Sequence, residues 1–117
     1  MELLVCVINQ EEKLEPVLSG LAELGVTGAT IVDTRGMAEH LPAGTPVLAG
    51  LQDLISRSRP ERKMILSVIE SDDTLERAIE MIRNVLGNLE RAGSGIVFTV
   101  PVNRALGLAG SPGLELD

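Results

Sequence analysis

The first strand-length segment of this chain is apolar on both of its faces. Residues Leu3–Ile8 form an uninterrupted run of six apolar side chains, bounded by the polar stretch 9–12. A run of this length suits a strand better than a helix, and a strand with one solvated face alternates apolar and polar side chains. The same two-sided character recurs at Met64–Ile69 and Ile96–Val102. A sheet built from these strands therefore needs cover on both faces.

Two amphipathic helices are predicted between these strands. After the first strand, apolar side chains recur at three- and four-residue steps, with Pro16 in the first turn and Gly25 as a left-handed C-cap. The second helix is predicted to begin after Ser71, a good N-cap, and to extend to about Arg91. A further strand is predicted at 29–34. This order predicts an α+β fold, a ferredoxin-like βαββαβ sandwich with a four-stranded antiparallel sheet and two helices on one face.

The size of the chain fits one domain, which we expect to span residues 1–117. Two helices cover only one face of the sheet. The other face is therefore predicted to be buried against another subunit, because an exposed apolar sheet of this area is itself an association site.

Composition excludes several classes of function. A net charge of −7 has the wrong sign for neutralising phosphate backbones, and Phe98 is the only aromatic residue, so nucleic acid is not expected as a partner. Charges or turn residues interrupt every apolar run before it reaches membrane-spanning length, and the N-terminus has no basic region of a secretory signal. We expect a cytoplasmic protein with no membrane insertion.

Catalytic and metal-binding chemistry have little support in the sequence. Cys6 lies within a predicted strand, far in sequence from His40, the only histidine, so a Cys–His catalytic pair is disfavoured and Cys6 fits a small core residue. The same two residues lack the spacing of a zinc motif. The chain is therefore not expected to be an enzyme or to hold a metal.

A long connection over 36–62 contains three of the six prolines of the chain. Within it, residues 47–58 show helical spacing, and the apolar face of that short helix has no assigned place in the two-layer core. We expect this face and two neighbouring arginines to contact a partner protein or to cover a cleft between subunits. The predicted partner-binding residues are Leu48, Leu51, Leu54, Ile55, Arg57 and Arg59.

Two segments resemble the PII signal-transduction family. Residues 23–31, ELGVTGATI, followed by Arg35 and Gly36, are similar to the family's LGVTG(x)T signature and to the glycine that opens its long T-loop. Residues 91–98, RAGSGIVF, are similar to its glycine-rich B-loop and the strand that follows. The resemblance implies a homotrimeric regulator in nitrogen signalling, with a T-loop-like insertion at 36–62 and a C-terminal tail at 105–117.

The resemblance also implies a ligand cleft between subunits that accepts an adenine nucleotide, with no cofactor required. The family's functional positions carried over to this chain are Ile8, Thr30, Gly36, Met37, Arg91, Gly93, Ser94 and Gly95. Ligand binding there is expected to change how the 36–62 loop contacts a regulated protein, such as a transporter or an enzyme.

The chain departs from the family where cations normally meet the triphosphate. Ile96 replaces a lysine, and Gly107 and Ala109 replace two arginines. Each lost charge-assisted contact removes roughly 1.5–3 kcal/mol, which predicts weak ATP binding and favours a smaller or less charged adenine ligand. The chain has no tyrosine, so tyrosine uridylylation is excluded. The alternative is a ferredoxin-like trimer of the CutA type with a metal-binding or structural role.

Overall fold

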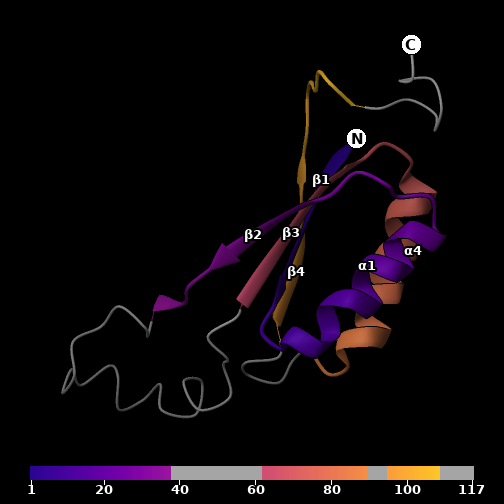
Figure 1. Cartoon of the computed structure of the whole chain (residues 1–117). Coiled ribbons are helices and arrows are strands. Elements are labelled where there is room, and N and C mark those ends of the chain that lie inside the picture. The colour runs from indigo at the N-terminus through magenta and orange to yellow at the C-terminus, as the bar shows by residue number, and fades with distance from the viewer. Residues whose placement is uncertain (38–61, 90–94, 109–117) are drawn as a thin grey trace.

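The computed structural model describes residues 1–37, 62–89 and 95–108. The described elements are β1 (Glu2–Ile8), a short 3-10 helix η1 (Glu11–Lys13), α1 (Leu14–Glu23), β2 (Thr30–Thr34), β3 (Arg62–Ile69), α4 (Asp72–Leu86) and β4 (Gly95–Pro101). The strands form one sheet in the order β2-β3-β1-β4, and each neighbouring pair is antiparallel. Both helices lie on the same side of the sheet (Figure 1). This arrangement is compatible with the predicted ferredoxin-like sandwich.

The hydrophobic core lies between the sheet and the two helices. Alternate residues of the central strands β1 and β3 face the helices, and each buried aliphatic side chain contributes about 1.5–3 kcal/mol to stability. The core residues are Leu4, Cys6, Ile8, Val17, Leu21, Ile65, Ile69, Leu75, Ala78, Ile82 and Leu86.

The helix ends follow from local sequence, with one correction. Pro16 lies in the first turn of α1, and Gly25 follows that helix with a φ of 89°, both as predicted. The Ser71 hydroxyl accepts a hydrogen bond from the Thr74 amide at 3.3 Å and caps α4. The prediction that this helix extends to about Arg91 was wrong: α4 ends at Leu86, because Gly87 takes a φ of 81° that a right-handed helix cannot continue. In the described ranges no helix is long and apolar enough to cross a membrane.

The side of the sheet that faces away from the helices is apolar, as the two-sided strands predict. It carries three rows of cross-strand neighbours, with one residue each from β3, β1 and β4. The rows are Met64–Val7–Ile96, Leu66–Val5–Phe98 and Val68–Leu3–Val100, and together we call them the apolar outer face.

The edge of the apolar outer face is open to solvent in a single chain. Ile96, Phe98 and Val100 of β4 are 52%, 44% and 42% exposed. No described helix covers these positions, because α1 and α4 both lie on the opposite side (Figure 1). The described part of a single chain therefore leaves uncovered the apolar surface that the sequence pattern predicts to be buried.

Candidate functional site: a pocket beside the end of the third strand

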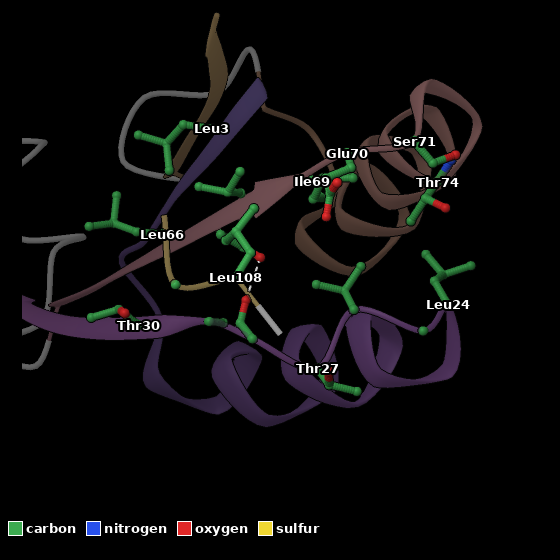
Figure 2. Close-up of a pocket in the computed structure, with 17 residues that line it drawn as sticks. Leu3, Leu24, Thr27, Thr30, Leu66, Ile69, Glu70, Ser71, Thr74 and Leu108 are labelled. Carbon is green, nitrogen blue, oxygen red and sulfur yellow. Dashed lines mark hydrogen bonds between the residues drawn. The ribbon is translucent and has the colours of Figure 1, made fainter. Parts of the chain in front are cut away.

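A pocket forms where β3 extends past its neighbour β2. The register of these two strands begins at Thr30 opposite Leu66, so β3 continues from Ser67 to Ile69 beyond the first residue of β2. The chain that enters β2, residues 24–30, forms one wall, and the end of β3 with the start of α4 forms another (Figure 2). Gly107 and Leu108 add a contribution from the chain after β4. The pocket is open to solvent on one side and has a volume of about 730 Å³, in the range of small-molecule sites.

The chemistry of the pocket is apolar with several hydroxyl groups. Its apolar lining comes from leucine, valine and isoleucine side chains of β1, of β3, of the segment between α1 and β2, and of the chain after β4. Its polar side chains are Thr27, Thr30, Ser67, Ser71, Thr74 and Glu70. Among the described residues that line it, Glu70 carries the only formal charge. Such a lining suits an uncharged, hydrogen-bonding group better than an anion.

Ser67 connects the two walls of the pocket. Its hydroxyl donates a hydrogen bond to the Gly28 carbonyl oxygen at 2.6 Å, drawn as a dashed line in Figure 2. The two residues are 39 positions apart in sequence, so this bond joins the segment before β2 to β3. Ser67 is 3% exposed and is the buried polar residue in the described part of the chain.

Several sequence-predicted ligand residues lie at the opposite end of the sheet from this pocket. Ile8 is fully buried and is paired with Gly95 on one side and Lys63 on the other. Gly95 has a φ of 137°, and a Cβ added there would lie 2.6 Å from the Val7 carbonyl oxygen. Only a glycine fits this close approach of two backbones.

The base of the long insertion lies at the same end. Gly36 packs directly against the Arg62 guanidinium group, which occupies the space that any side chain at position 36 would need. Met37 is 66% exposed beside it. Lys63 forms an ion pair with Asp33 across the β2–β3 ladder at 2.5 Å. A side chain at position 36 would displace only the flexible end of Arg62, so the space around Gly36 does not by itself require a glycine.

The structure thus separates the predicted ligand residues into two groups. Thr30 lines the pocket, whereas Ile8, Gly36, Met37 and Gly95 lie toward the other end of the sheet. Outside the described residues lie the predicted ligand residues Arg91, Gly93 and Ser94 and the predicted partner-binding residues Leu48, Leu51, Leu54, Ile55, Arg57 and Arg59.

Sequence reasoning missed the contribution of the end of β3 and the start of α4. Ser67 appears in the sequence as one polar residue in an apolar strand, and this is the signal that marks it. Glu70 and Leu108 carry no such signal, because their place in the pocket depends on the strand register and on the path of the chain after β4. Gly107, noted as the replacement of a family arginine, also lines the pocket.

Cys6 and the acidic side chains are the residues that bear on nucleophilic catalysis and on metal binding. Burial raises the pKa of the Cys6 thiol to about 12, so the thiol is protonated at neutral pH and is a poor nucleophile. The part of the chain that the structure describes contains no group of three histidine, cysteine or acidic residues placed to hold a metal ion.

Comparison with known proteins identifies the family. The family model for nitrogen regulatory protein P-II matches residues 1–108, which is nearly the whole chain. The chain is also 28% identical over 94 residues to a protein named nitrogen regulatory protein P-II from Azospirillum brasilense, with 80% of each chain covered. The described fold and the glycine at position 36 agree with this match, which covers almost the full length of the chain. The chain belongs to the nitrogen regulatory protein P-II family.

Proposed function

We propose that this chain is a signal-transduction regulator that senses a small ligand at a site shared by two copies of itself. The observation that carries the proposal is the separation of the two groups of ligand residues. Leu3 lines the pocket and Ile8 lies at the other end of β1, five residues away, or roughly 17 Å at the rise of an extended strand. One chain cannot close both groups around one small molecule, but the pocket of one copy and the Ile8 end of another can.

The apolar outer face supports the assembly that this site requires. Three rows of apolar side chains, with the β4 edge about half exposed, favour burial against further copies of the chain. We propose a homotrimer, the assembly that the family resemblance implies.

The ligand proposed for the pocket is an adenine nucleoside or a nucleotide of low charge. The described lining offers hydroxyl groups and one carboxylate, and Gly107 stands where the family has an arginine. A triphosphate would therefore lack the cations that usually neutralise it on this wall. Glu70 adds a negative charge that disfavours a phosphate placed next to it.

The output of the proposed regulator is a contact with a second protein in nitrogen signalling, such as a transporter or an enzyme. We assign this contact to the insertion 36–62, whose base is held at Gly36 and Arg62. The family match favours a regulator over the CutA-type alternative with a metal-binding or structural role.

Isothermal titration calorimetry with adenosine, AMP and ATP tests the ligand assignment. We expect adenosine or AMP to bind more tightly than ATP. A variant Thr30→Val removes a pocket hydroxyl with little change in volume and is expected to weaken binding about three- to tenfold. Micromolar ATP binding that exceeds adenosine binding would contradict the assignment, and no heat with any of the three compounds would exclude an adenine ligand.

A further inference from the structure

Ser67 is unusual among the helix-facing residues of β3. Its neighbours on that face, Ile65 and Ile69, are buried core residues, and Ser67 is buried with them although its side chain is polar. A buried hydroxyl needs a hydrogen-bond partner to offset the loss of water. Its partner is the Gly28 carbonyl oxygen, in the segment that enters β2.

Few other described hydrogen bonds fix the position of that segment relative to β3. Near its start, the Val26 amide donates a hydrogen bond to the Leu21 carbonyl oxygen in α1, which ties this part of the segment to the helix. The β2–β3 register begins only at Thr30. Between these two points, the Ser67 hydroxyl holds Gly28 against the sheet.

Both residues of this bond line the pocket, so the bond sets the pocket's width. Resting on the proposed ligand function, we propose that Ser67 is a positioning residue that holds the Gly28 wall in place for an uncharged, hydrogen-bonding ligand group. The Ser67 hydroxyl acts through Gly28. Its loss lets residues 27–29 move away from β3 and leaves their peptide groups misplaced toward the ligand.

The exposure of Ser67 and Gly28 predicts that loss of their hydrogen bond affects ligand binding more than the stability of the fold. Gly28 is exposed, so water can replace the lost hydrogen bond to its carbonyl oxygen. Replacement of Ser67 by alanine should therefore cost little stability, while the wall of the pocket loses its fixed position. If Ser67 served only the core, its replacement by alanine would lower the stability and leave ligand binding unchanged.

The test compares three variants by calorimetry with adenosine and by thermal denaturation. Ser67→Ala removes the hydroxyl, and Ser67→Thr keeps it. Thr99→Ala is the matched control, because Thr99 and Ser67 flank Leu4 in the same cross-strand row but Thr99 does not line the pocket. We expect Ser67→Ala to weaken adenosine binding about tenfold, with Ser67→Thr and Thr99→Ala within threefold of the original protein.

A second readout keeps this inference separate from the ligand assignment. The carbonyl carbon of Gly28 should change its NMR chemical shift in Ser67→Ala, without ligand, and should not change in Thr99→Ala. If the original protein binds no adenosine, AMP or ATP, the ligand assignment fails and this shift alone decides the role of Ser67. An unchanged Gly28 shift, full adenosine affinity in Ser67→Ala, or an unfolded Ser67→Ala protein would each overturn the proposal.

Discussion

Gly95 is the residue where two backbones approach most closely at the start of β4. Its φ of 137° and the Val7 carbonyl oxygen leave no room for a Cβ, and a backbone atom cannot move aside as a flexible side chain can. We predict that Gly95→Ala lowers the free energy of unfolding by about 1–3 kcal/mol, measured by urea denaturation. Gly28→Ala is the control, because an added Cβ there meets nothing within 4 Å. Equal urea midpoints for the two variants would contradict the steric argument.

Cys6 gives the stability of the protein a defined dependence on alkaline pH. Its pKa is raised to about 12 in the folded chain by burial, from an ordinary value of 9.0. As the pH rises, the thiol therefore loses its proton in the unfolded chain before it does so in the folded chain. The contribution of Cys6 to the free energy of unfolding is complete below pH 9 and is lost as the pH rises from about 9 toward 12. We predict a loss of up to about 1.4 kcal/mol per pH unit in that window.

The control for this prediction is Cys6→Ala, which lacks the thiol. Its free energy of unfolding is lower than that of the original protein below pH 9 because of the cavity, but its slope between pH 9 and 11 should be smaller. Parallel slopes for the two proteins would show that other groups cause the alkaline transition.

At the scale of elements, α4 depends on its N-cap. The Ser71 hydroxyl bonds the Thr74 amide, and Asp72 and Asp73 place carboxylates at the positive end of the helix dipole. We predict that Ser71→Ala lowers the free energy of unfolding by about 1 kcal/mol and that Ser71→Asp restores most of it. Thermal denaturation followed by circular dichroism measures both. A Ser71→Asp protein as unstable as Ser71→Ala would indicate that the hydroxyl does not act as a cap.

The elements that the sequence predicted well are those with strong local signals. The four strands, Pro16 in the first turn of α1 and the Ser71 cap all follow from neighbours in sequence. The end of α4 was missed because the apolar spacing continues through Leu89, while Gly87 turns the backbone at its own position. The pocket was only partly predicted, through Thr30. Its other walls depend on which residues of β3 lie beyond the β2 register, and local pattern does not encode that.

At the scale of the whole molecule, the apolar outer face is not covered by the described residues of one chain. Phe98 lies on this face and is 44% exposed. Ile31 is similarly exposed, at 45%, but it pairs with Ile65 across the β2–β3 ladder and therefore lies on the helix-facing side of the sheet. We predict that Phe98→Glu releases monomers, because burying an unpaired charge costs about several kcal/mol. Ile31→Glu should leave the assembly intact. Light scattering measures the mass of both variants, and a monomeric original protein or dissociation by Ile31→Glu alone would refute the assignment of this face.

The position of the pocket and of Ile8 at opposite ends of β1 has a consequence for how such a sensor would respond. A ligand held between two copies acts as a reversible cross-link, so ligand binding and association share one coupling free energy. If association of the copies raises the affinity for the ligand by a given factor, ligand binding strengthens association by the same factor. The apparent affinity then rises with the concentration of the protein itself. The cell would set the threshold of the signal by how much of this chain it makes.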